Sequence, residues 1–377
     1  MPATPSPTPS SPTGPATTPP PSAPPPGTPL GTLAAGTVVP AHPLALDADR
    51  RLDERRQRAL TRYYLAAGAV GVAVGVHTTQ FAIREPSAGL LRPVLELASE
   101  VVREEAARLR PPEEAAAPFV RIAGACGYTR QAVAEAELAR ELGYDAVLLS
   151  PLVPGADEAG LLERTRAVGE VLPVIGFYLQ EAVGGRRLSP AYWSALAGIE
   201  SVVAIKTAPF DRYRTADVIA AVAASGRAGE VALYTGNDDA IVQDLLTPYR
   251  TAEGERWFAG GLLGHWAVWT RAAVRLFHEV RRARAGDHGL LTALLARGPQ
   301  VTESNAAVFD VRYDFRGCIA GVHEVLRRQG LLAGTWCLDV DEGLSPGQAE
   351  EIARVVKAYP WLTDDAFVAE HLDDWLR

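Results

Sequence analysis

The chain has few cysteines and no long apolar run, and each scarcity excludes a class of protein. Its 377 residues include three cysteines, Cys126, Cys318 and Cys337, which lie far apart without a CxxC spacing. Neither a disulfide framework nor a zinc site is therefore indicated. No apolar run is long enough to cross a bilayer, and no basic segment followed by an apolar one marks a secretory signal. We expect a cytoplasmic protein without a membrane partner.

A net positive charge and nucleotide-binding motifs are also missing, and the Arg-rich stretch at 281–284 is interpreted as a solvated helix face. The formal net charge is -8, which argues against a nucleic-acid partner because phosphate binding depends on clustered Lys and Arg. No GxGxxG or GxxxxGK[ST] segment follows an apolar run, so no nucleotide cofactor is indicated. No His and carboxylate residues have a spacing typical of a metal site. We therefore expect neither a cofactor nor a metal.

Lysine is also scarce, because almost every positively charged residue of the chain is an arginine. Only Lys206 and Lys357 occur among 37 basic residues. Lys206 ends the apolar run SVVAIK at 201–206, whereas Lys357 lies in a stretch typical of a helix surface. A guanidinium stays protonated, but a desolvated amine loses its proton and can attack a carbonyl. Lys206 is therefore a candidate nucleophile; the alternative is a strand-end lysine that reaches solvent.

The order of apolar and amphipathic segments predicts a (β/α)8 TIM barrel. Residues 1–33 are rich in Pro, Ser and Thr, and we expect a disordered tail there. Residues 34–285 form the expected barrel and 286–377 a small helical C-terminal extension. Expected strands alternate with helical stretches, as a parallel barrel requires. These strands lie at 36–41, 71–76, 119–123, 146–150, 173–178, 201–206, 231–235 and 257–261. An open doubly wound sheet is the competing architecture, but it lacks its nucleotide motif.

Polar side chains stand at the ends of several expected strands, where a barrel carries its reactive groups. Lys206 ends the sixth strand and Tyr178 the fifth, so a phenol is expected beside the amine, where it could relay a proton. A tyrosine that only fills the barrel mouth is the alternative. Thr78 and Thr79 follow the second strand and could hold a carboxylate.

Further candidates flank these positions. His77 and Gln80 border the threonine pair, Gly236 follows the seventh strand, and His265 follows the eighth. Either histidine could exchange protons near neutral pH or simply be hydrogen-bonded in the barrel mouth. His265, Trp266 and Trp269 together could form an aromatic wall against a larger aldehyde.

In these motifs the chain resembles the dihydrodipicolinate synthase and N-acetylneuraminate lyase superfamily of class I, Schiff-base aldolases. The resemblance rests on Thr78-Thr79, Tyr178 and Lys206, in that order along the chain, and on the segment Gly236-Asn237-Asp238-Asp239. It implies that Lys206 forms an imine with pyruvate or a related 2-oxo acid and that the threonines hold the carboxylate. Tyr178 would pass protons and an aldehyde would be the second partner. It also implies a homo-oligomer, a dimer or tetramer.

The sequence departs from that family at several positions. His77 and Gln80-Phe81 replace the usual residues around the threonine pair, and Ser150-Pro151 stand where the synthases have a tyrosine pair. Val183 falls where the synthases have an Arg that grips the second substrate, although Arg186 or Arg187 could compensate. Standard synthase activity is therefore not expected. Two alternatives remain open: a sugar-acid dehydratase or decarboxylase that uses the same imine, and a barrel that binds a small molecule without turnover.

Overall fold

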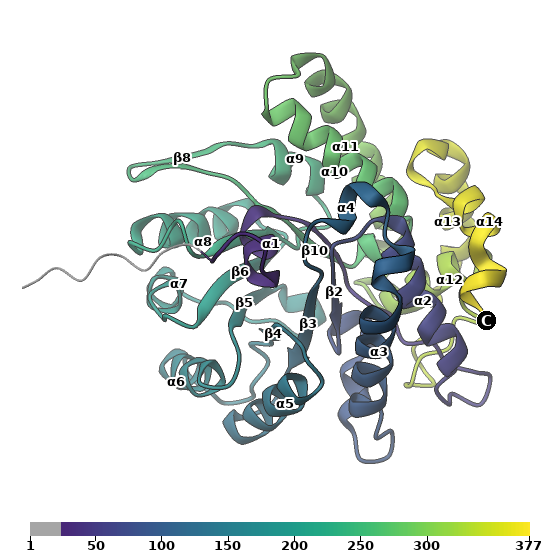
Figure 1. Ribbon diagram of the computed structural model, residues 1–377, viewed down its shortest axis with the longest axis horizontal. Helices are drawn as coiled ribbons and strands as arrows, with labels where there is room; N and C mark the ends of the chain where they lie inside the picture. Colours follow the sequence, from purple (N-terminus) through teal and green to yellow (C-terminus); the bar gives the residue numbers. More distant parts are fainter. Residues whose placement is uncertain (1–23) are drawn as a thin grey trace, which may run out of the picture.

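A computed structural model describes residues 24–377 of the chain, and its centre is a ring of parallel strands surrounded by helices (Figure 1). The strands of the ring are β1 (Val38–Pro40), β2 (Gly71–Val74), β3 (Val120–Ala125), β4 (Ala146–Leu149), β5 (Val174–Leu179), β6 (Val202–Ala208), β7 (Ala232–Thr235) and β10 (Gly260–Leu263). They are hydrogen-bonded in the order β1-β10-β7-β6-β5-β4-β3-β2, and a bridge between Ala41 and Ala73 closes the ring. The (β/α)8 barrel predicted from the sequence is confirmed.

The outer layer consists of the helices that connect successive strands. These are α2 (Glu54–Ala67), α3 (Leu91–Leu109), α4 (Pro112–Ala115), α5 (Thr129–Glu141), α6 (Glu158–Gly169), α7 (Pro190–Ala197), α8 (Arg212–Ala224), α9 (Ile241–Leu246) and α10 (Thr270–Arg284). A hairpin of β8 (Tyr249–Thr251) and β9 (Gly254–Arg256) projects from the barrel after α9. This hairpin was not expected from the sequence.

The barrel strands separate two apolar cores, because successive side chains along a strand point to opposite faces. One core fills the barrel and includes Ile175, Phe177 and Ala204. The other lies between strands and helices and includes Val174, Tyr178 and Ile205. A residue's position along its strand therefore decides whether its side chain reaches the barrel interior.

A short helix, α1 (Pro29–Ala35), covers the N-terminal end of the barrel (Figure 1). Leu33 packs into the inner core, and the Tyr234 hydroxyl donates a hydrogen bond of 2.7 Å to the carbonyl of Leu33. The disordered tail was predicted for residues 1–33, of which 1–23 lie outside the described residues. For 29–33 the prediction is wrong, because this segment forms part of α1 and its Leu33 side chain is buried at the N-terminal end of the barrel.

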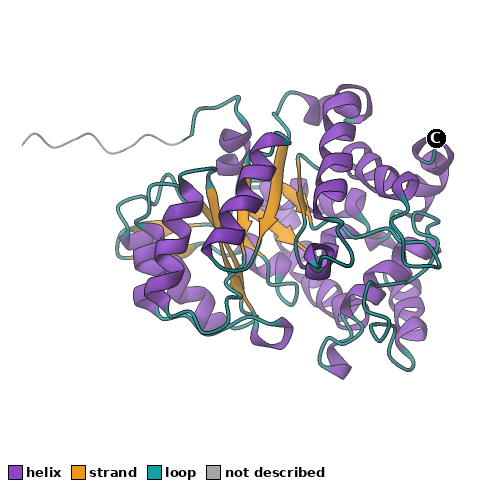
Figure 2. Ribbon diagram, turned by 90° about the horizontal axis from the view of Figure 1, so that it is seen from below, coloured by secondary structure: helices purple, strands orange, loops and turns teal. Residues whose placement is uncertain are grey.

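The chain ends in four further helices beside the barrel (Figure 2). They are α11 (His288–Val308), α12 (Cys318–Arg328), α13 (Gln348–Ala358) and α14 (Asp365–Trp375). The last of them lies against α2, where Arg62 donates to the carbonyl of Trp375 at 2.6 Å. Among residues 24–377, no helix is long and apolar enough to cross a membrane.

The remaining short segments are 3-10 helices in the loops. They are η1 (His77–Thr79), η2 (Phe81–Arg84), η3 (Glu181–Val183), η4 (His265–Ala267), η5 (Val311–Tyr313) and η6 (Pro360–Leu362). Two of them, η1 and η3, contribute residues to a pocket at the end of the barrel where the strands terminate.

Candidate active site

Lys206 stands on β6 with its side chain inside the barrel. It lies one position from Ile205, which faces the helices, and shares the inner face with Ala204 and Ala208. The residue is 9% exposed, and burial lowers the pKa of its amine from 10.5 to about 8, although the negative charge of Asp238 opposes this shift. Burial disfavours the charged form of an amine. The lowered pKa increases the share of Lys206 that is uncharged at neutral pH.

Gly236, directly after β7, provides the room for this lysine. A Cβ at position 236 would lie 2.5 Å from Cε of Lys206 and 2.8 Å from Cβ of Ala208. Both distances are shorter than any ordinary contact, so a larger residue would displace the lysine. Gly236 lines the pocket, as a predicted site residue should, and its role there is to leave space.

Asp238 brings a buried carboxyl to the same pocket, and the sequence patterns did not single it out. Its Oδ1 accepts a hydrogen bond of 2.9 Å from the backbone N–H of His265. Burial raises the pKa of Asp238 to about 7, against the opposing influence of that N–H group and of Lys206. A carboxylate that directly follows a barrel strand is a signal that could have identified it. The pocket therefore holds an amine and a carboxyl whose pKa values are both moved toward neutrality.

Tyr178 does not lie beside Lys206, which corrects the prediction from the sequence. In the ladder between β5 and β6, Phe177 is the partner of Lys206, and Tyr178 is the partner of Thr207. The Tyr178 ring points to the helix layer, where its centroid lies 4.8 Å from that of Trp193. The Phe177 ring takes the inner position, 4.4 Å from Nζ of Lys206. No phenol among the pocket residues is therefore available for a proton relay.

The two threonines after β2 have different surroundings. Thr78 lines the pocket, and its hydroxyl makes no hydrogen bond to another described residue. Thr79 is fully buried: its hydroxyl donates to the carbonyl of His42 at 2.6 Å and accepts from the N–H groups of Gly75 and Val76 at 2.9 and 3.2 Å. Thr78 can therefore meet a ligand, whereas Thr79 holds the loop in place, contrary to the role predicted for it.

Of the three other predicted contact residues His77, Gln80 and His265, only His77 lines the pocket. His77 lines the pocket, and burial together with the charge of Lys206 lowers the pKa of its imidazole to about 4. Gln80 turns away from the pocket, and its Oε1 accepts from the backbone N–H of Leu338 at 2.7 Å. His265 is 1% exposed and lies behind the pocket, where only its backbone reaches Asp238. The substrate contacts predicted for the Gln80 and His265 side chains are therefore wrong.

The aromatic wall predicted around His265 is made by other residues. Trp266 and Trp269 are buried in the core between barrel and helices. The aromatic side chains that line the pocket are instead Phe177, Phe210, Phe309 and Phe315. Phe309 and Phe315 lie beyond the barrel, in the segment that connects α11 to α12, so their neighbours could not be inferred from the barrel pattern.

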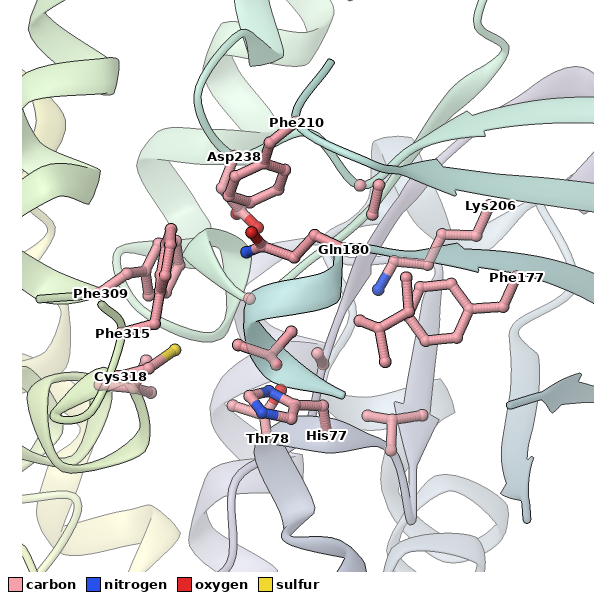
Figure 3. Close-up of a pocket in the computed structure, with 18 residues that line it drawn as sticks. His77, Thr78, Phe177, Gln180, Lys206, Phe210, Asp238, Phe309, Phe315 and Cys318 are labelled. Atoms are coloured by element: carbon pink, nitrogen blue, oxygen red, sulfur yellow. The ribbon is translucent and has the colours of Figure 1, made fainter. Parts of the chain in front are cut away.

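These side chains surround one cavity with an open mouth (Figure 3). Lys206 and Phe177 lie on one side, Phe309, Phe315 and Cys318 on the opposite side, and Gln180 and Asp238 between them. The space free of protein atoms is about 650 Å³, which includes open solvent at the mouth. In the part of the chain that the structure describes, no group of three or more His, Cys, Asp or Glu side chains is arranged to hold a metal ion.

The fold of this chain is similar to that of several solved structures. No protein-family model and no curated protein sequence matches the chain. The fold is similar to that of an Escherichia coli K12 prophage protein of the dihydrodipicolinic acid synthase family, solved in complex with pyruvate, with a TM-score of 0.68 and 17% identity over 86% of this chain and 98% of that one.

Two further solved structures show the same likeness. Dihydrodipicolinate synthase from Oceanobacillus iheyensis has a TM-score of 0.65 and 20% identity over 85% of this chain and 96% of its own. N-acetylneuraminate lyase from Fusobacterium nucleatum has a TM-score of 0.65 and 15% identity over 86% and 99% of the two chains. The chain thus has the same barrel fold as these solved structures, at 15–20% sequence identity to them.

Proposed function

We propose that this protein is a class I aldolase-type lyase in which Lys206 forms an imine with pyruvate or a related 2-oxo acid. The observation that supports this most strongly is a lysine inside the barrel, at the end of β6, whose pKa is lowered to about 8 and which faces a pocket. At pH 7 an amine of that pKa is about one-tenth uncharged, whereas one with the ordinary value is almost wholly protonated. The location matches the usual place of reactive groups in such barrels.

The chemistry begins when Nζ of Lys206 attacks the keto carbon. Loss of the resulting hydroxyl as water leaves a protonated imine, which withdraws electrons from the neighbouring methyl carbon. Loss of a methyl proton then gives an enamine, whose carbon can bond to an aldehyde carbon. Water finally hydrolyses the imine and releases the product from Lys206. The same steps in reverse cleave a carbon–carbon bond.

Asp238 is the group best suited to carry protons in this sequence. Burial raises the pKa of its carboxyl to about 7, so both protonation states are populated near neutral pH, as acid–base catalysis requires. His77 is uncharged at neutral pH because the pKa of its ring is lowered, so it can hydrogen-bond a ligand but is a weak base. Asp238 thereby takes over the part that the sequence assigned to Tyr178.

The carboxylate of the 2-oxo acid requires donors near Lys206. The Thr78 hydroxyl has no protein partner among the described residues and faces the pocket, so it is free to donate a hydrogen bond. The solved structure of the Escherichia coli prophage protein with pyruvate supports a ligand of this class in a barrel of this fold.

The alternatives from the sequence fit the pocket less well. A sugar-derived acid would need hydrogen bonds to several hydroxyl groups, but the wall opposite Lys206 is made of Phe309, Phe315 and Val322. A barrel that binds without turnover would gain nothing from a buried amine of lowered pKa. The predicted homo-oligomer and the cytoplasmic location stay predictions.

Exchange of the methyl protons of pyruvate in D2O tests the proposed function, because it reports the enamine without any second substrate. We expect proton NMR to show exchange with the wild-type protein and none with Lys206→Arg, since a guanidinium cannot form the imine. Lys357→Arg is the matched control, because this is the other lysine of the chain and lies on α13 outside the pocket. Equal exchange rates for wild type and Lys206→Arg would contradict the proposal.

A further inference from the structure

The half of the pocket opposite Lys206 is apolar and is built by segments that the barrel alone does not supply. Phe309, Phe315, Cys318 and Val322 come from the C-terminal helices and the connection between them, and Phe210 comes from the loop after β6 (Figure 3). A ligand attached to Lys206 would therefore extend from the barrel interior toward this apolar wall. What binds there would be the second reactant.

Two phenylalanines of this wall are held in a backbone conformation that bulky residues rarely adopt. Phe210 has φ +52° and Phe315 has φ +65°, and their rings meet edge to face with centroids 6.0 Å apart. Such conformations cost free energy and persist only where the surroundings enforce them, commonly at functional sites.

Specific hydrogen bonds enforce both conformations. The Phe210 N–H donates to Oδ1 of Asn237 at 3.0 Å, and Nδ2 of Asn237 is anchored by Asp244 at 3.0 Å. Around Phe315, Oδ2 of Asp310 accepts from the N–H of Gly317 at 2.9 Å, and the Phe315 N–H donates to the carbonyl of Asp310 at 3.1 Å. These hydrogen bonds hold the backbone at both phenylalanines.

The charges around this wall disfavour an anionic partner. Among the residues that line the pocket, the charged side chains are Lys206 and Asp238, and none is an arginine. Both arginines that could have replaced the missing family Arg turn elsewhere: Arg186 donates to the carbonyl of Ala156 at 2.6 Å, and Arg187 pairs with Glu181 at 3.0 Å. A second carboxylate would therefore lack a cationic partner and would lie near Asp238.

We propose that the second reactant is an uncharged aromatic aldehyde whose ring lies among Phe210, Phe309 and Phe315. This inference rests on the proposed function, because the aldehyde reacts with the enamine on Lys206. The enamine carbon bonds to the aldehyde carbon, the electrons of the C=O bond move to its oxygen, and that oxygen takes a proton from Asp238. Water then hydrolyses the imine, returning the amine and releasing a 4-aryl-4-hydroxy-2-oxo acid.

Competition between two aldehydes tests the inference. With pyruvate as the donor, we expect kcat/KM for benzaldehyde to exceed that for succinic semialdehyde by about tenfold or more, since burying an aromatic ring is favourable and an unpaired carboxylate is not. NMR follows both the product and, in D2O, the exchange of pyruvate methyl protons. Intact exchange with an equal or lower kcat/KM for benzaldehyde, or with no reaction, overturns the inference alone. Absence of exchange refutes the proposed function and the inference together.

Two variants with matched controls probe the wall directly. Phe315→Ala should raise KM for benzaldehyde about tenfold, because it removes an aromatic neighbour of the aldehyde ring. Tyr313→Ala is its control, since Tyr313 is 41% exposed on the same connection and does not line the pocket. Equal KM values for Phe315→Ala and its control would place the aldehyde elsewhere and contradict the inference.

Val183→Arg should reverse the preference by giving the pocket the cation it lacks. We expect kcat/KM for succinic semialdehyde to rise about tenfold or more, as a charge-assisted hydrogen bond allows. Leu152→Arg is the control, because Leu152 is 43% exposed beside the same loop and lies outside the pocket. An unchanged preference in Val183→Arg, with exchange intact, would show that charge does not select the aldehyde and would contradict the inference.

Discussion

The pair of threonines after β2 gives a sharp prediction, because two adjacent and identical side chains have different tasks. In Thr79→Val, a methyl group replaces a buried hydroxyl that joins three backbone groups, namely the carbonyl of His42 and the N–H groups of Gly75 and Val76. Each buried group left without a partner costs about 1–3 kcal/mol. The bonds to Gly75 and Val76 share one acceptor oxygen, so the costs do not simply add. We expect the free energy of unfolding to fall by about 3 kcal/mol.

Thr78→Val makes the same chemical change one residue earlier and is the matched control. The Thr78 hydroxyl holds no other described residue, so its loss should change the free energy of unfolding by less than about 0.5 kcal/mol. It should instead raise KM for pyruvate, because the hydroxyl is the proposed carboxylate donor. Urea unfolding followed by circular dichroism gives the stabilities, and pyruvate exchange gives the activity. Equal stability of Thr79→Val and wild type would refute the reasoning, and so would equal destabilisation by both variants.

Three other predictions follow from the geometry around Lys206. The rate of imine formation with pyruvate, measured by cyanoborohydride trapping, should rise with pH through about 8 as the amine of Lys206 loses its proton. In Asp238→Asn the midpoint of this rise should move to lower pH. The variant lacks the carboxylate charge that raises the pKa of Lys206. An unmoved or raised midpoint would contradict the coupling. Gly236→Ala should reduce pyruvate exchange at least about tenfold and lower the free energy of unfolding by about 1–3 kcal/mol, because the new methyl group would overlap the lysine side chain and Cβ of Ala208. Full exchange would show that the lysine has enough room. Tyr178→Phe should change the exchange rate less than about twofold, since the phenol ring packs against Trp193. A hundredfold loss of exchange would instead support the proton-relay role that the sequence predicted for Tyr178.

The fold and the buried lysine of the pocket could be predicted from the sequence because each rests on a local signal. The alternation of apolar runs and amphipathic helices is enough for a barrel, and Lys206 stands out as one of two lysines at the end of an apolar run. Gly236 and Thr78 followed from their places directly after strands, and both line the pocket.

The error at Tyr178 arose because β5 and β6 are apolar on both faces. Strands covered on both sides show no alternation of polar and apolar residues, so the sequence does not reveal which side chains face inward. A shift of one residue moves a side chain to the other face. The ladder between β5 and β6 also contains an irregularity at Val174 and Ile175, which counting along the chain cannot reveal.

The apolar wall escaped prediction because it is formed by contacts between distant segments. Helix α11 continues through Pro299 to Val308 and so carries Phe309 to the pocket. Proline normally ends or kinks a helix, and tertiary contacts override that preference here. The left-handed residues Phe210 and Phe315 have no signature in the sequence, since neither is Gly or Asn.

Reductive trapping tests the central claim most directly, because the chain offers only two lysines to distinguish. The wild-type protein is incubated with pyruvate and borohydride, digested, and its peptides analysed by mass spectrometry. We expect the mass of one reduced pyruvate on the peptide that contains Lys206 and none on the peptide that contains Lys357. An unmodified Lys206 across pyruvate and several other 2-oxo acids, or equal labelling of both lysines, would contradict the account.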